Sequence, residues 1–208
     1  MADMRGKLRV ILRAVWRWVR WPVLVLGFLY AVLVGFRTFV LFDEEKTAEA
    51  VAQIHAQKIT LADVMGATLP PAPDQAENDA TVAGIDKNNN GIRDDVELAI
   101  FKKYPNSAKI RAAELQYAMA LQLMLTKVTN TETWIAAAKE TSRGAACIGE
   151  TVPNKDLNIY DIRTEEVKNI ILNTLTRKDR WERSYDFTTS YGLPNTDLCN
   201  VDLDTLPE

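Results

Sequence analysis

A stretch of twelve residues near the middle of the chain carries oxygen-bearing side chains at the spacing of a calcium-binding loop. It reads DKNNNGIRDDVE and satisfies the pattern D-x-[DN]-x-[DN]-G-x5-E over its full length. Calcium takes roughly six to eight oxygen ligands, and this spacing can supply them from one short segment. Gly91 permits the sharp reversal that such a loop needs. We predict a calcium site whose ligands are the side chains of Asp86, Asn88, Asn90, Asp94 and Glu97 and the backbone carbonyl of Ile92.

These residues resemble the EF-hand loop, and more closely the bacterial and thrombospondin-type DxDxDG calcium loops. In the latter, isoleucine often follows the glycine, as Ile92 follows Gly91 here. The resemblance covers the twelve residues and the helix that leaves them. It departs from an EF-hand at Arg93, which stands where paired EF-hands have an apolar residue, and no helix clearly precedes Asp86. The resemblance therefore implies a single structural calcium site rather than a paired sensor.

Two alternatives concern this part of the sequence. An Asn-Gly turn followed by an acidic helix start would need no metal, but three carboxylates and two asparagines exceed what a turn requires. A partner loop can be sought from Asn154 through Asp156 and Asn158 to Glu165, yet Ile159 occupies its glycine position. We therefore predict one calcium loop.

The remaining residues suited to chemistry are few. Cys147 and Cys199 lack C-x-x-C spacing, and the one histidine, His55, is far from both in sequence. In an oxidising compartment the two cysteines would form a disulfide, and the alternative is two separate buried thiols. We predict the disulfide. His55 is expected on the surface of a stalk helix, which argues against a histidine triad or a histidine metal site.

The sequence patterns that would indicate an enzyme or a partner-binding surface are weaker. A glycosidase needs two carboxylates, but nothing in the spacing of the helical glutamates selects a pair. The glutamates available are Glu114, Glu132, Glu140, Glu150, Glu165 and Glu166. Trp181 and Tyr185 lie beside basic residues and could form a partner surface, although i,i+4 spacing favours core packing at a helix end.

The charge of the chain is unevenly distributed. The net charge is −3 over 208 residues, but residues 1–42 hold seven Lys or Arg and one Asp, so the rest of the chain is strongly acidic. An acidic domain of this kind argues against nucleic acid as a partner, because phosphate binding needs clustered cations. The basic end is better suited to anionic lipid headgroups.

An uncharged apolar run follows the basic end. It extends from Trp21 to Phe36 and continues, after Arg37, through Phe42. Together these residues are long enough to span a bilayer of ~30 Å if Arg37 snorkels outward. Arg5, Arg9, Arg13 and Arg17 recur every fourth residue before it, which predicts an interfacial helix with a basic stripe. By the positive-inside rule, the basic residues before the apolar run predict a cytoplasmic N-terminus and an exported C-terminal part.

A cleaved signal peptide is the alternative to this membrane anchor. It requires a small-x-small site shortly after the apolar run. Ala48-Glu49-Ala50 is the nearest match, but it follows charged residues well beyond Phe36. We therefore predict a single-pass protein of a bacterial inner membrane whose C-terminal domain is periplasmic or extracellular.

The pattern after the membrane segment is helical throughout, and the predicted fold class is all-α. Capping and apolar signals predict a helix after Asp95 that ends at Tyr104-Pro105, and a central helix capped by Asn106 or Ser107. A capping box at Thr129 predicts a third helix ending near Gly144, and Thr164 is expected to open a fourth. The predicted parts are a basic segment 1–20, a transmembrane helix 21–42, a stalk helix 43–60, a proline-rich linker 61–80 and a helical domain 81–208.

These patterns favour a non-catalytic module. We expect it to be tethered in the cell envelope, to bind calcium and to contact another envelope protein. A membrane-tethered hydrolase of cell-wall material, using two carboxylates, is the alternative. A deep cleft joining two carboxylates of raised pKa would favour the hydrolase.

Overall fold

The computed structural model describes residues 2–192 and 197–207, with the side chains of 2–15, 17 and 39 excepted. Over these ranges the chain is helical and contains no strand, which confirms the all-α prediction. The chain divides into two compact units, residues 1–48 and residues 49–208. We describe each unit by itself.

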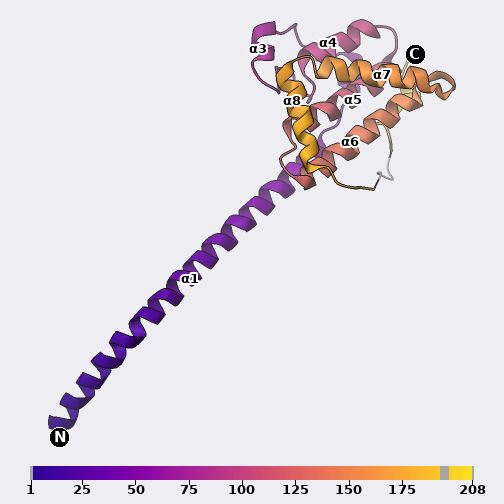
Figure 1. Cartoon of the computed structure of the whole chain (residues 1–208). Helices are drawn as coiled ribbons and strands as arrows, with labels where there is room; N and C mark the ends of the chain where they lie inside the picture. The colour runs from indigo at the N-terminus through magenta and orange to yellow at the C-terminus, as the bar shows by residue number, and fades with distance from the viewer. Residues whose placement is uncertain (1, 193–196, 208) are drawn as a thin grey trace. The chain divides into compact units, whose positions relative to one another are not determined.

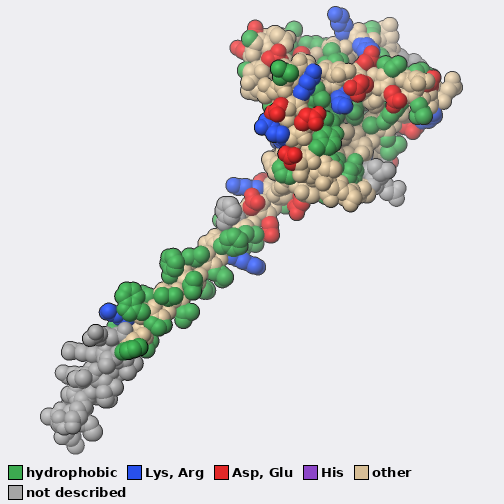
Figure 2. Space-filling model, viewed as in Figure 1, with side chains coloured by type: hydrophobic (Ala, Val, Ile, Leu, Met, Phe, Trp, Pro, Cys, Tyr) green, Lys and Arg blue, Asp and Glu red, His purple; other side chains and the backbone are tan. Residues whose placement is uncertain are grey.

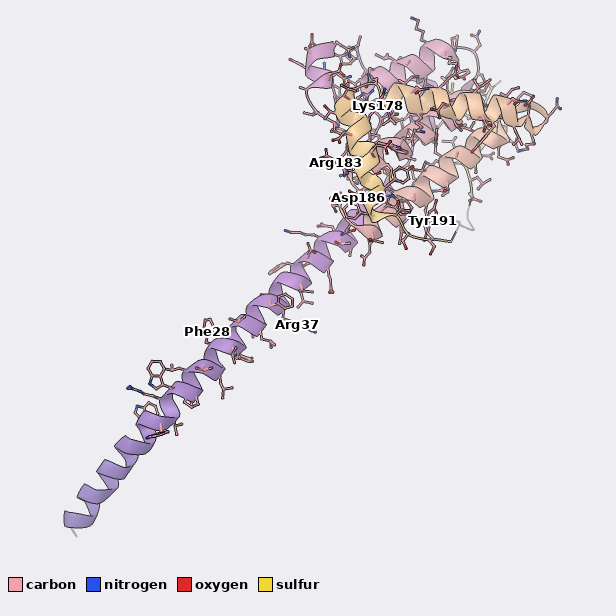
Figure 3. All side chains as sticks on the ribbon, viewed as in Figure 1. Phe28, Arg37, Lys178, Arg183, Asp186 and Tyr191 are labelled. Carbon is pink, nitrogen blue, oxygen red and sulfur yellow. A yellow bond between two sulfur atoms is a disulfide. The ribbon has the colours of Figure 1, made fainter. Side chains whose placement is uncertain are left out.

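The first unit lies within helix α1, Ala2–Ala56. Its part from Trp18 onward is the one helix among the described residues that is long and apolar enough to cross a membrane. The large apolar side chains of this part are exposed rather than covered by protein (Figure 2). Phe28 is one of them (Figure 3). Phe36 is also exposed. Arg20 lies over the ring of Trp21. The predicted stripe of Arg5, Arg9, Arg13 and Arg17 falls outside the side chains that the structure describes.

The second unit is a helical bundle (Figure 1). After α1 the elements are α2 (Leu61–Met65), α3 (Gln75–Asp79), α4 (Asp94–Lys103), α5 (Ala108–Thr126), α6 (Thr131–Glu150), η1 (Pro153–Lys155), α7 (Leu157–Ile171), α8 (Leu175–Ser184), η2 (Tyr185–Phe187) and η3 (Leu203–Thr205).

Helix α5 is the centre of this bundle, as its broad apolar pattern predicts. It contacts α2, α4, α6, α7, α8 and η3. Almost every side chain from Ala108 to Leu125 is buried, including Leu115, Met119 and Leu121. Ser107 caps its first turn by accepting from the amide of Ile110, one of the two caps expected there. The other helices bury their apolar faces against α5, which is the usual way a bundle hides a single core.

Helix α6 begins and ends beyond the expected positions. Its capping box joins Asn130 to Thr133 rather than Thr129 to Glu132. It runs past Gly144, which was expected near its end, to Glu150. Gly144 instead faces α5, where a Cβ would lie 2.8 Å from the Cα of Tyr117. This glycine therefore permits close approach of two helices and does not end one.

Helix α7 also differs from its prediction. It begins at Leu157, capped by the side chain of Asp156, so that Thr164 lies in its interior and bonds back to the carbonyl of Tyr160. Asp156 and Glu165 thus belong to one helix and its cap, and they do not form the second loop considered above. The local signal at Thr164 is satisfied by back-bonding within a helix.

Residues 61–80, expected to be a linker, pack against the bundle. They contain α2 and α3, whose N-caps are Thr60 and Asp74. Val64 and Asn78 are completely buried. The compact unit accordingly begins at Glu49, before the predicted start at residue 81. Helix α1 ends at Ala56, close to the predicted end of the stalk.

The predicted disulfide between Cys147 and Cys199 is confirmed. It joins α6 to the segment that precedes η3, over a sequence separation of 52. The buried Cys147 belongs to the core. The bridge therefore holds the C-terminal segment against the bundle.

Candidate metal-binding loop

The predicted calcium loop lies between α3 and α4, and its last four residues form the first turn of α4. Its two ends are tied together, because the amide of Asp94 donates to the carbonyl of Ile85 at 2.8 Å. The amide of Ile85 in turn donates to Oδ1 of the buried Asn78. Ile92 is fully buried in the core beside Val96. The loop is therefore anchored to the bundle from both sides.

Asp86 organises the turn at the start of the loop. Its carboxylate accepts from the backbone amides of Asn90 at 3.2 Å and Gly91 at 2.9 Å. Gly91 has a φ of +84° and Asn89 a φ of +56°. The left-handed conformation is accessible to glycine at little cost and is tolerated by asparagine. The sequence at these positions is therefore compatible with a tight reversal around Asp86.

Glu97 meets both asparagines of the motif. Its Oε2 accepts from Nδ2 of Asn88 at 3.0 Å, and its Oε1 accepts from Nδ2 of Asn90 at 3.1 Å. Glu97 is fully buried. Positions three, five and twelve of the motif thus converge on one point. To bind a cation there, each amide would have to turn its oxygen, in place of its nitrogen, toward the ion.

One carboxylate oxygen of Asp94 has no hydrogen-bond partner among the described residues. Its Oδ1 accepts from the amide of Lys87 at 3.0 Å, while its Oδ2 is buried and has no hydrogen-bond partner among the described residues. The residue is fully buried. A buried carboxylate oxygen without a partner is costly, and a cation or a proton would relieve that cost.

When no cation is bound, burial disfavours the ionised form of the loop's carboxylates. Loss of water raises the pKa of Asp86, Asp94 and Glu97, and that of Glu97 reaches about 7. The nearby charge of Asp63 adds to the rise for Glu97. A bound divalent cation would reverse this effect, because it favours the charged form of each carboxylate.

Acidic side chains alone do not make the site. Among the described residues, no three His, Cys, Asp or Glu side chains are grouped closely enough to hold a metal by themselves. The loop would need the amide oxygens of Asn88 and Asn90 and the carbonyl of Ile92 as well. Mixed carboxylate, amide and carbonyl ligands are the set that calcium accepts.

Two contacts outside the motif support the loop, and no sequence signal points to them. Nε2 of Gln57, just after α1, donates to the carbonyl of Asn90 at 2.8 Å. Nδ2 of Asn88 also donates to the carbonyl of Thr68 at 3.1 Å. The loop thus contacts segments that precede it by about twenty to thirty-three residues.

Arg93, the residue that departs from the EF-hand pattern, has a structural role. Its guanidinium is fully buried and donates to the carbonyls of Ile170 and Ile171 at the end of α7, at 2.9 and 3.2 Å. It also pairs with Asp95. A cation at a helix C-terminus satisfies carbonyls that have no partner within the helix and interacts favourably with the dipole.

The other sequence candidates lie elsewhere. Nδ1 of His55 is 3.0 Å from Oε1 of Glu140, so this half-exposed side chain has a defined partner. Trp181 is buried in the core and packs edge-to-face against Tyr185 at 5.5 Å, as their spacing predicts, but Tyr185 itself is exposed. Glu114 is buried against Arg163 at 2.7 Å.

No protein-family model, curated protein or solved structure matches this chain.

Proposed function

We propose that the chain is a membrane-anchored, extracytoplasmic calcium-binding module. The observation that carries this proposal is the set of Asp86, Asp94 and Glu97 in one anchored loop. All three have a raised pKa, and Oδ2 of Asp94 is buried without a partner. Together with the oxygen-bearing side chains of Asn88 and Asn90, they are suited to a hard divalent cation.

Calcium in this loop would act on the fold rather than on a substrate. The loop leads directly into α4, packs Ile92 into the core and accepts a hydrogen bond from Gln57. An ion that neutralises its buried carboxylates would stabilise the loop and the segments that contact it. A single site of this kind suits a structural role, since paired loops are the arrangement typical of sensors.

The anchor supports the membrane part of the proposal. The exposed apolar side chains of α1 from Trp18 onward are suited to lipid, and basic residues precede them in the sequence. By the positive-inside rule the N-terminus would be cytoplasmic, beside anionic headgroups, and the acidic bundle would lie outside. We propose a bacterial inner membrane and an envelope protein as partner.

The alternative function, a carboxylate-dependent hydrolase of cell-wall material, requires a cleft that joins two carboxylates of raised pKa. Cavities of about 670, 480 and 350 Å³ lie in the part of the bundle that the structure describes. Asp86, Asp94, Glu97 and Glu114, whose pKa is raised, line none of these three. None of these three cavities therefore joins two carboxylates of raised pKa, as the hydrolase would require.

Thermal unfolding of the full chain in uncharged detergent tests calcium binding. We expect calcium to raise the Tm by mass action and magnesium to raise it less, because magnesium demands stricter octahedral geometry. Asp86→Ala and Glu97→Ala should abolish the difference between the two ions. Glu182→Ala, an exposed glutamate on α8, is the matched control and should keep it. An equal response in all four proteins would contradict the assignment.

Affinity purification of the tagged full chain from membranes, with calcium or with chelator, tests the partner. A protein retained with calcium and lost with both chelator and Glu97→Ala would support a calcium-dependent envelope interaction. A protein retained equally under all three conditions would separate partner binding from the loop.

A further inference from the structure

A second possible binding site lies away from the calcium loop. It is the cavity of about 480 Å³ bounded by the end of α1, the middle of α6 and the C-terminal segment held by the disulfide. More basic side chains line this cavity than line either of the other two described above. The charged residues that line it are His55, Lys58, Lys139, Glu140, Arg143 and Asp197.

The cations of this cavity differ in their partners. The guanidinium of Arg143 is buried and fixed, because it donates to Glu140 at 2.7 Å and to the carbonyl of Asp197 at 2.9 Å. Lys58 and Lys139, by contrast, have no hydrogen-bond or ion-pair partner among the described residues. Their ammonium groups remain available to a ligand.

The acidic residues of the cavity do not cancel this charge. Glu140 is buried and its two oxygens are taken by Arg143 and His55, at 2.7 and 3.0 Å. Asp197 is exposed and contributes one carboxylate. The cavity wall therefore has two unpaired lysines and one exposed carboxylate. Its other charged side chains, Glu140, Arg143 and His55, contact one another.

His55 is positioned to add a donor. Because Nδ1 contacts the buried Glu140, the ring is held at the cavity wall while the side chain remains 45% exposed. A carboxylate on one ring nitrogen orients the imidazole and leaves the other nitrogen for a ligand. Protonated on both nitrogens, the ring would donate to an anion.

We propose that this cavity binds a phosphate group, held by Lys58 and Lys139 and oriented by His55. Lysine ammonium groups bind phosphate as point charges, and two of them match the charge of a phosphate dianion. The fixed Arg143–Glu140 pair sets the shape of the wall. The phosphate could be free or part of a lipid headgroup, and the experiment separates these sources. This proposal does not depend on calcium binding.

Thermal unfolding of the full chain in uncharged detergent and metal-depleted buffer tests the proposal. One series receives inorganic phosphate, a second receives glycerol 3-phosphate as a headgroup fragment, and a third receives chloride at equal ionic strength. We expect either phosphate compound to raise the Tm by several degrees relative to chloride, by mass action. A larger rise with glycerol 3-phosphate would indicate a lipid headgroup, and a larger rise with inorganic phosphate would indicate the free ion.

One double variant and two control variants decide the result. The double variant Lys58→Gln, Lys139→Gln should lose the rise, and it should fold because neither lysine has a partner to lose. Lys178→Gln, which removes one exposed lysine from α8, should keep it (Figure 3). Glu97→Ala should also keep it, which distinguishes this site from the calcium loop. No rise with either compound, or an undiminished rise in the double variant, would overturn the proposal.

Discussion

The side-chain amide of Asn90 donates to Oε1 of Glu97 over 3.1 Å, in a buried part of the loop. A buried carboxylate that accepts hydrogen bonds from two amides is still short of the compensation that its charge requires. This is why the pKa of Glu97 rises to about 7 despite those bonds. Without a cation, folding therefore favours the protonated form of the Glu97 side chain.

The stability of the metal-free protein should fall as pH rises from about 4.5 to about 7. The pKa of Glu97 is 4.5 when unfolded and about 7 when folded, so the folded state binds more protons over that window. Its contribution is fully present below pH 4.5 and lost above pH 7, and amounts to at most about 3 kcal/mol. The raised pKa values of Asp86 and Asp94 act in the same direction. Urea unfolding in metal-depleted buffer at several pH values measures this fall.

Glu97→Gln is the variant for this experiment, because it keeps the shape of the side chain and cannot ionise. The fall in unfolding free energy between pH 5 and pH 8 should be smaller in the variant. Saturating calcium should remove the fall in the wild type, since the ion takes the place of the proton. Identical pH dependence of the two metal-free proteins would show that Glu97 titrates normally.

The buried Arg177 should contribute far more to the free energy of unfolding than the exposed Arg183 on the same helix. Arg177 is fully buried and donates to Asp79, Asn173 and the carbonyls of Asn78, Thr81 and Val82. Arg177→Met would remove all five of these hydrogen bonds and should cost about 3–5 kcal/mol. Arg183→Met removes only an exposed pair with Asp179 and should cost less than about 1 kcal/mol. Urea unfolding measures both, and equal losses would contradict the structural role of Arg177.

Removing the disulfide should destabilise the bundle without abolishing the helices. Closing a loop with a sequence separation of 52 contributes on the order of 4 kcal/mol in the chain-entropy estimate. The double variant Cys147→Ala, Cys199→Ala should lose about this much unfolding free energy. Reductant should produce a similar loss in the wild type and none in the variant. An equal effect of reductant on both proteins would point to a cause other than the bridge.

The features predicted correctly from the sequence were those with a local signal. The apolar pattern of α5, its cap at Ser107 and the end of α4 before Pro105 each depend on residues within a few positions of one another. The disulfide was predicted from the presence of two cysteines and from the expectation that the domain is exported. Such signals need no knowledge of the tertiary fold.

The features that the sequence did not reveal depend on long-range contacts. Gly144 resembles a helix end but serves the approach of α6 to Tyr117. The proline-rich stretch around residue 70 resembles a linker, yet Val64 and Asn78 on either side of it are buried by helices far along the chain. Arg93 departs from the EF-hand pattern in the sequence, but in the structure it donates to carbonyls of α7 some 77 residues away. Tertiary packing thus overrides the local pattern at these three positions.

Topology has a direct test that is independent of the loop. A reporter that is active only outside the cytoplasm should be active when fused after Glu208, because the positive-inside rule keeps the basic end inside. The same reporter fused after Arg20 should be inactive. Activity of the second fusion and silence of the first would reverse the proposed orientation.

Calorimetric titration of the metal-depleted full chain with calcium tests the central claim most directly. The loop should bind one ion per chain with an affinity in the ~10⁻⁶–10⁻³ M range that suits a single extracellular site. Binding should release protons at pH 6 and fewer at pH 8, since Glu97 must be deprotonated to serve as a ligand. Glu97→Gln should weaken binding strongly, whereas Glu182→Gln should leave it unchanged. Absence of any binding heat in the wild type at millimolar calcium would contradict the account and reduce the motif to a turn.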